Sequence, residues 1–170
     1  MSNIILVGMP ACGKSTIGVV LAKTINKGFV DTDILIQEQE NNKLQDIINQ
    51  KGNDYFHKVE ESVLKSLDKT NSVIATGGSA IYFPEAIAHL KQKGIVIYIK
   101  VSKTTILDRL DNIKTRGVTL EQGQTLEDLY NVRVPLYEKY ADIIIEAEKL
   151  RVEEVIENII EKIKDLEKDN

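Results

Sequence analysis

Residues 8–16 are Gly-Met-Pro-Ala-Cys-Gly-Lys-Ser-Thr, which fits the pattern G-x-x-x-x-G-K-[ST] of a phosphate-binding loop. The loop follows an apolar run at 4–7, which predicts a buried strand, and precedes an apolar stretch at 17–22, which predicts the first turns of a helix. Glycines let such a loop turn tightly enough for successive N–H groups to point at one anion. The helix N-terminus adds partial positive charge. This context favours a P-loop over a chance glycine turn.

The loop residues predict a nucleoside triphosphate site that uses magnesium. We expect Lys14 to contact the β- and γ-phosphates and the Ser15 hydroxyl to ligate Mg²⁺. Cys12 occupies a variable position of the motif, so we interpret it as a small filler rather than a redox-sensitive thiol. Main-chain N–H groups should hold the phosphates, and the predicted nucleotide-binding positions are Gly8, Ala11, Cys12, Gly13, Lys14, Ser15 and Thr16.

Size and composition restrict the class of protein. The chain has 170 residues, 42% of them hydrophobic, which suits one domain spanning 1–170. A net charge of -4 argues against a general nucleic-acid binder, and no apolar run approaches the roughly 18 residues that span a membrane. A strand expected from residue 3 leaves no room for a signal peptide, and one cysteine cannot form an internal disulfide. We therefore expect a cytoplasmic monomer that binds small molecules, not nucleic acid or membranes.

Short apolar runs alternate with helical patterns along the whole chain, which predicts a central parallel sheet with helices on both faces, a three-layer α/β fold. Ligands of such sheets bind beyond the carboxyl ends of the strands. The expected strands are Asn3–Val7, Gly28–Asp31, Ser72–Thr76, Ile95–Val101 and Asp142–Ala147. The expected helices are Lys14–Ile25, Asp33–Gln39, Leu44–Gln50, Asn53–Asp68, Pro84–Lys93, Lys103–Asn112, Leu126–Tyr140 and Val152–Leu166.

A polar stretch at about 113–125 interrupts this alternation. It lies between two expected helices, on the side of the sheet where nucleotide would bind. We interpret it as a mobile lid whose Arg116 approaches the transferring phosphoryl group as a catalytic cation. An ordinary solvated loop remains the alternative.

Two carboxylates end the second expected strand, in Asp31-Thr32-Asp33. We assign Asp31 to the magnesium shell and Asp33 to the acceptor hydroxyl, from which it would accept a proton. Helix capping is the alternative, because aspartate is favoured at an N-cap.

The third expected strand ends in Thr76-Gly77-Gly78-Ser79, where the glycines let the backbone approach a substrate closely; a tight turn is the alternative. Arg133, on the helix after the lid, can hold an anionic acceptor group by two parallel hydrogen bonds. Its alternative is a surface salt bridge with Glu138 or Asp128.

Two further side chains leave their roles open. Arg109 either stacks on adenine or pairs with Asp108 or Asp111. His57 precedes Glu60 and Glu61 by about one helical turn, a spacing typical of a solvated pair, and no other ligand cluster supports a metal site there.

These motifs together resemble the shikimate kinase family, one of the nucleoside-monophosphate-kinase-like P-loop kinases, over nearly the whole chain. The resemblance implies a P-loop kinase fold, ATP and Mg²⁺ as cofactors, and phosphoryl transfer to the 3-hydroxyl of shikimate. It implies acceptor-binding helices at about 33–68, with Asp33 binding ring hydroxyls as the base. It also implies that Arg116 closes from the lid. The positions implied to contact the acceptor are Asp33, His57, Gly77, Gly78, Ser79 and Arg133.

The chain departs from the family pattern where His57 replaces a carboxylate-binding arginine and Ser79 replaces a third glycine. Histidine, with an unperturbed pKa of about 6.5, is mostly neutral at pH 7, whereas arginine is always charged. These departures leave open a related kinase that acts on a different polyol or sugar acid. A non-catalytic ATP-binding module is the alternative from another class of protein.

Overall fold

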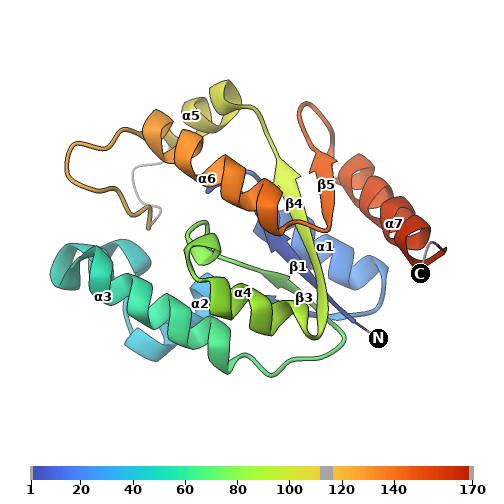
Figure 1. Cartoon of the computed structure of the whole chain (residues 1–170), viewed down its shortest axis with the longest axis horizontal. Helices are drawn as coiled ribbons and strands as arrows, with labels where there is room; N and C mark the ends of the chain where they lie inside the picture. Colours follow the sequence, from blue (N-terminus) through green and yellow to red (C-terminus); the bar gives the residue numbers. More distant parts are fainter. Residues whose placement is uncertain (1, 112–116, 169–170) are drawn as a thin grey trace.

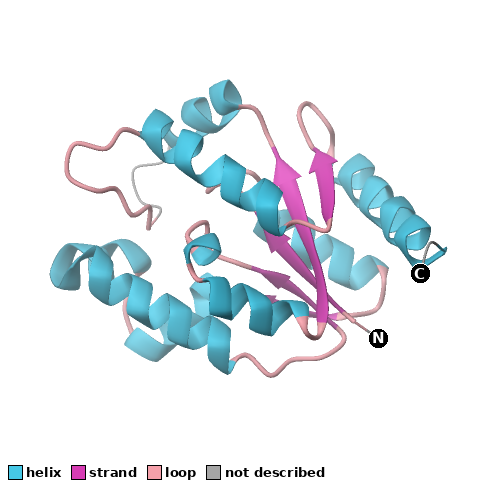
Figure 2. Cartoon of the chain, in the orientation of Figure 1, coloured by secondary structure: helices cyan, strands magenta, loops and turns pink. Residues whose placement is uncertain are grey.

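A computed structural model describes residues 2–111 and 117–168. Its described part contains one sheet of five parallel strands in the order β2-β3-β1-β4-β5. The strand arrows in Figure 2 accordingly point toward one common edge. The strands are β1 (Asn3–Val7), β2 (Gly28–Asp31), β3 (Ser72–Ala75), β4 (Gly94–Lys100) and β5 (Ile143–Glu146).

Helices cover both faces of this sheet (Figure 1). The connection from β1 to β2 runs in one direction and the later connections run in the other, so right-handed crossovers put α1 on the opposite face from α4 and α6. The C-terminal helix α7 packs beside α1 and β5. The helices are α1 (Lys14–Thr24), α2 (Thr32–Glu40), α3 (Leu44–Ser66), the 3₁₀ turn η1 (Ala80–Tyr82), α4 (Pro84–Lys91), α5 (Lys103–Asp111), α6 (Leu126–Tyr140) and α7 (Val152–Lys168).

The core is aliphatic around the central strand. All five residues of β1 are buried, as expected for a strand covered on both faces. Tyr98 of β4 and Tyr137 of α6 are also buried and stack with ring centroids 5.1 Å apart. The apolar face of α7 packs against this core through Val155, Ile156 and Ile159.

The predicted three-layer fold is confirmed, and element boundaries differ from the prediction by one or two residues. The helices predicted on either side of 51–52 are continuous as α3, except that Gly52 has non-helical torsions of φ 83° and ψ 168° and bends the chain there. The turn η1 was not predicted, because three residues are too few to show a helical period.

The topology places a crevice at the carboxyl edge of the sheet. The chain leaves β1 toward β2 and leaves the adjacent β3 toward β4, so the two connections diverge at that edge. Ligands of open α/β sheets bind at such a point. No helix in the described ranges is both long and apolar enough to cross a membrane.

Candidate active site

The loop between β1 and α1 has the backbone of an anion cradle. Gly8 and Gly13 have φ of 152° and 100°, and Ala11 has φ of 66°, so the chain winds through left-handed conformations. A Cβ at Gly8 would lie 2.8 Å from the carbonyl oxygen of Ile99, which restricts this position to glycine. Gly13 begins α1 without a side-chain cap, and the first N–H groups of a helix have no partners within it. The loop can therefore offer several N–H donors to one anion.

Lys14 lies folded along this loop. Its Nζ donates to the carbonyl oxygens of Gly8 at 2.7 Å and Met9 at 3.0 Å, and lies 3.6 Å from Sγ of Cys12. The side chain is buried but still lines the cleft. The ammonium group is thereby held close to the loop's N–H donors.

Asp31 caps a helix and also contacts the P-loop serine. Its Oδ1 accepts hydrogen bonds from the backbone N–H groups of Asp33 at 3.0 Å and Ile34 at 3.4 Å, which makes it the N-cap of α2. Its Oδ2 accepts from the Ser15 hydroxyl at 2.6 Å. The capping alternative therefore applies to Asp31 rather than Asp33, and the second oxygen stays beside Ser15.

One cleft of about 950 Å³ joins the P-loop to the ends of β2 and β3. Its walls include Lys14, Ser15, Asp31 and Asp33 on one side. The cleft continues between α3 and the described part of the predicted lid, where Gly117 and Val118 line it. The remaining predicted positions along it are Ala11, Gly13, Thr16, Gly77, Gly78, Ser79, Arg109 and Arg133.

Arg133 is almost fully buried in this cleft, with only 1% of its surface exposed. Its Nε donates to the Tyr82 hydroxyl at 3.1 Å and its Nη2 to the Thr119 hydroxyl at 3.2 Å. The surface salt bridge considered for Arg133 is wrong, because Asp128 instead forms a capping box with Thr125. The other candidate partner, Glu138, pairs with Lys100 at 3.2 Å.

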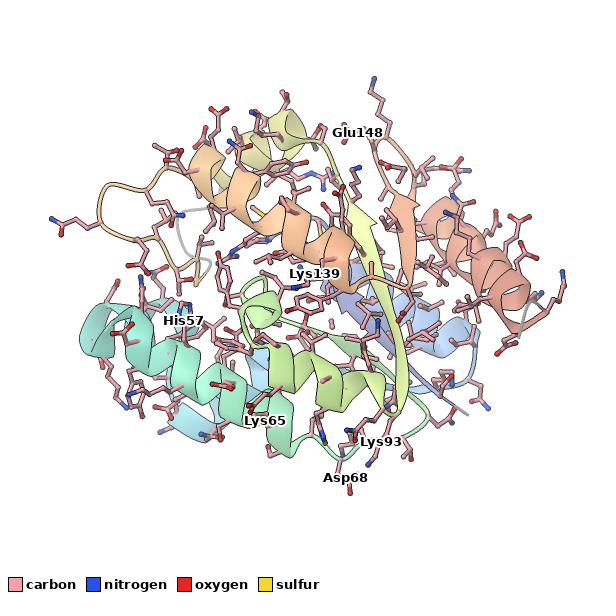
Figure 3. The ribbon with its side chains drawn as sticks, viewed as in Figure 1. His57, Lys65, Asp68, Lys93, Lys139 and Glu148 are labelled. Atoms are coloured by element: carbon pink, nitrogen blue, oxygen red, sulfur yellow. The ribbon has the colours of Figure 1, made fainter. Side chains whose placement is uncertain are left out.

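His57 lies behind the cleft wall rather than on it. The half-buried ring has the rings of Tyr82 and Phe83 about 6.0 Å and 5.9 Å away. In Figure 3 its side chain extends from α3 toward the loop that leads into α6. There Nε2 lies 3.1 Å from the Thr119 hydroxyl. Burial, and then the positive charge of Arg133, lower the pKa of His57, so the ring is neutral at pH 7.

The position of Glu60 differs from the one predicted from the sequence. We expected a solvated pair with His57, but Glu60 has no exposed surface and borders the cleft. Its Oε2 accepts from the Ser79 hydroxyl at 2.5 Å, while Oε1 has no hydrogen-bond partner in the described structure. Burial raises the pKa of Glu60 to about 7, helped by the negative charge of Asp33 and opposed by the Ser79 hydrogen bond.

The glycine pair after β3 lies against these charged side chains. A Cβ at Gly77 would lie 2.4 Å from Oε1 of Glu60 and 2.9 Å from Oδ1 of Asp33. A Cβ at Gly78 would lie 2.7 Å from Nη1 of Arg133. Two carboxyl groups and a guanidinium therefore converge over a surface that carries no side chain.

Two predicted site residues remain, Arg109 and Arg116, of which the structure describes only Arg109. Arg109 is exposed at the cleft, and its Nη1 donates to the carbonyl oxygen of Ala11 at 3.0 Å, which ties α5 to the P-loop. Arg116 lies outside the described residues. Outside the cleft, Nε2 of His89 lies 3.0 Å from the carbonyl oxygen of Leu67. No cluster of metal-binding side chains occurs within residues 2–111 and 117–168.

Sequence reasoning missed three site residues, namely Glu60, Tyr82 and Thr119. Glu60 falls three residues after His57 on the face of α3 that carries Phe56 and Val63, so its place on an apolar helix face could have indicated burial. Tyr82 and Thr119 lie in segments without periodicity, and only the tertiary structure brings their hydroxyls to Arg133.

The family model described as shikimate kinase matches residues 10–164. A shikimate kinase from Sulfurihydrogenibium is 36% identical over 165 residues, which cover 96% of this chain and 99% of that protein. One from Thermoanaerobacter pseudethanolicus is 34% identical over 94% of this chain and 95% of that protein.

Solved structures agree with these relatives. A shikimate kinase from Acinetobacter baumannii, solved in complex with shikimate, superposes with a TM-score of 0.89 and 32% identity, covering 97% of this chain and 94% of that chain. The Aquifex aeolicus shikimate kinase gives a TM-score of 0.82, also at 32% identity, over 95% and 96% of the two chains. Because these matches span almost its whole length, the chain belongs to the shikimate kinase family, phosphotransferases with the P-loop kinase fold.

Proposed function

We propose that the protein transfers the γ-phosphoryl group of MgATP to the 3-hydroxyl of shikimate. The observation that carries the proposal is the burial of the Arg133 guanidinium in the cleft. The guanidinium is almost fully buried in the cleft, yet no carboxylate of residues 2–111 or 117–168 lies within 4.0 Å of it. A buried cation is stabilised by an anionic partner, and the carboxylate of the acceptor would supply one. The relative from Acinetobacter baumannii was solved with shikimate bound.

The P-loop and Lys14 would hold the nucleotide. The N–H donors of the loop and of the first turn of α1 suit the β- and γ-phosphates. The ammonium group of Lys14 has three N–H donors, of which Gly8 and Met9 take two, so the third, now 3.6 Å from Sγ of Cys12, could turn to the phosphates. The protein's contribution to catalysis is then positioning and neutralisation of charge.

The side chains of Ser15, in the first turn of α1, and Asp31, at the end of β2, fit a magnesium ion. Ser15 and Asp31 supply a hydroxyl and a carboxylate side by side, and Mg²⁺ is commonly held by one or two such oxygens together with waters and substrate phosphates. A bound Mg²⁺ would neutralise charge on the phosphates. Asp31 would keep capping α2 through its other oxygen.

Asp33 is our candidate for the base. It lines the cleft at the first turn of α2, and its Oδ1 projects over Gly77 on the acceptor side of the P-loop. From there it would accept the proton of the attacking hydroxyl. Two roles remain predictions: Arg116 as the lid cation, and Arg109 as an adenine contact.

A screen of acceptors by coupled ADP release tests the proposal. Shikimate should give magnesium-dependent turnover well above that of other polyols and sugar acids. Strong turnover with another alcohol and none with shikimate would favour the related kinase. Nucleotide binding without transfer to any small alcohol would favour the non-catalytic module.

A further inference from the structure

Thr119 lies between Arg133 and His57, the two side chains that the resemblance implied to contact the acceptor. Its hydroxyl accepts from Nη2 of Arg133 at 3.2 Å and lies 3.1 Å from Nε2 of His57. Thr119 is only 4% exposed, although it lies in a connection between α5 and α6. A buried hydroxyl with two polar partners is held in one orientation.

The three nitrogens of the Arg133 guanidinium have different surroundings. Nε donates to Tyr82 and Nη2 donates to Thr119, so protein groups fix two of them. The third, Nη1, lies beside Gly78, where the cleft wall has no side chain. The guanidinium is planar, so fixing two nitrogens also fixes the direction of the third.

The partner on the other side of Thr119 is itself anchored. The His57 ring lies among Phe56, Tyr82 and Phe83 and is neutral at pH 7. A neutral imidazole whose Nε2 is unprotonated accepts a hydrogen bond there, so the Thr119 hydroxyl can donate to His57 and keep its lone pairs as acceptors for Arg133. His57 thereby acts on the cleft through Thr119 and not by direct contact.

We infer that Thr119 is a positioning residue for acceptor binding: its hydroxyl, anchored on His57, holds Arg133 so that Nη1 faces the carboxylate of the acceptor. This inference rests on the proposed function, because it needs an acceptor that carries an anion. It assigns Thr119 to acceptor affinity and gives His57 a supporting role.

Steady-state kinetics of Thr119→Val, which keeps the side-chain shape and removes the hydroxyl, test the inference. We expect the KM for shikimate to rise roughly tenfold, the effect of one lost hydrogen bond to a charged group, with kcat and the KM for ATP within about twofold of wild type. Thr119→Ser should restore the KM. Thr24→Val makes the same change at the last residue of α1, where the hydroxyl bonds only its own helix, and should change nothing.

Histidine NMR gives a readout that does not depend on turnover. The chain has 2 histidines, so the ring signals of His57 and His89 can be followed separately. Shikimate should shift the His57 signal in wild type and in Thr119→Ser, but not in Thr119→Val, while His89 stays constant in all three. A signal that follows shikimate equally in Thr119→Val would overturn the inference.

The outcomes separate this inference from the function on which it rests. A wild-type protein that neither binds nor phosphorylates shikimate refutes the proposed function. Normal wild-type turnover with an unchanged shikimate KM in Thr119→Val refutes the positioning role alone. A lower KM in that variant also refutes it, because the hydroxyl would then compete with the acceptor for Arg133.

Discussion

The Ser79 hydroxyl donates a 2.5 Å hydrogen bond to Oε2 of Glu60, and both side chains are buried beside the acceptor end of the cleft. Ser79 stands where the resemblance led us to expect a glycine. The bond satisfies one carboxyl oxygen and leaves Oε1 directed over Gly77. The ionisation of Glu60 therefore depends on its burial and on the Ser79 hydrogen bond.

Stability should fall as pH rises through the range in which Glu60 ionises. Its pKa is raised from 4.5 to about 7 in the folded protein, so the folded state holds this proton more tightly than the unfolded chain does. The contribution is fully present below pH 4.5 and is lost between about pH 4.5 and 7, amounting to about 3 kcal/mol at most. Lys14, Asp33 and Arg133 also act on this carboxyl group.

Urea denaturation of wild type and Glu60→Gln at intervals from pH 4.5 to 8 measures this effect. The difference in unfolding free energy between the two proteins should change across that range and level off above pH 7. Glu61→Gln is the matched control, because Glu61 is partly exposed and pairs only loosely with Lys65, at 3.9 Å. A constant difference between Glu60→Gln and wild type would contradict a raised pKa.

Replacing Ser79 by alanine should raise the pKa of Glu60 further, because the lost hydrogen bond favours the ionised form. At pH 8, where the carboxylate is charged, we expect a loss of about 1–3 kcal/mol in unfolding free energy, and a smaller loss at pH 5. Ser66→Ala, which removes a hydroxyl bonded to the Val63 carbonyl of its own helix, should show no such pH dependence. Equal losses at both pH values would argue against the coupling.

A methyl group at Gly77 should block the acceptor and spare the nucleotide. In Gly77→Ala the new Cβ would meet Oε1 of Glu60 at 2.4 Å and Oδ1 of Asp33 at 2.9 Å, so both carboxyl groups must move. We expect kcat/KM for shikimate to fall at least about a hundredfold, as small displacements of reacting groups can cause. Calorimetry should find the Kd for MgATP within about twofold of wild type. Undiminished turnover would mean that neither carboxyl group contacts the acceptor.

Removal of the P-loop ammonium group should slow transfer strongly without unfolding the protein. Lys14→Met keeps the aliphatic stem and removes the charge, and we expect kcat to fall about a hundred- to a thousandfold. Lys23→Met, in the last turn of the same helix, is the control. Circular dichroism should be unchanged in both, and near-normal turnover by Lys14→Met would reject the assignment of the loop.

The fold was predictable because strands and helices have local signals in the sequence. The apolar run at 4–7 lies next to a glycine-rich loop, and a short apolar run bounded by turn residues is typical of a buried strand. The break near Gly52 was also predictable, since it separates two periodic segments. The sequence could place Asp31, Asp33 and Arg133 at one edge of the sheet because the carboxyl ends of parallel strands meet there.

Side-chain partnerships across that edge were not predictable in the same way. The position of Glu60 on the apolar face of α3 could have indicated its burial, but not its partner Ser79, which lies 19 positions later in the chain and beyond β3. Thr119 bonds His57 at a separation of 62 positions. No period encodes such contacts, because they depend on how an irregular connection packs against α3.

Asp33 provides the sharpest test of the chemistry. Asp33→Asn keeps the size of the side chain but cannot accept a proton, so kcat should fall about a hundred- to ten-thousandfold, the usual contribution of a general base. The KM for ATP should stay close to wild type, because Asp33 lies by Gly77 and not in the P-loop. Asp54→Asn, at an exposed position of α3, is the control.

A fall in kcat that disappears as pH rises, when hydroxide can replace the base, would further support the role of Asp33. Wild-type kcat in Asp33→Asn would show that positioning and charge neutralisation suffice, and that the acceptor loses its proton without this carboxylate.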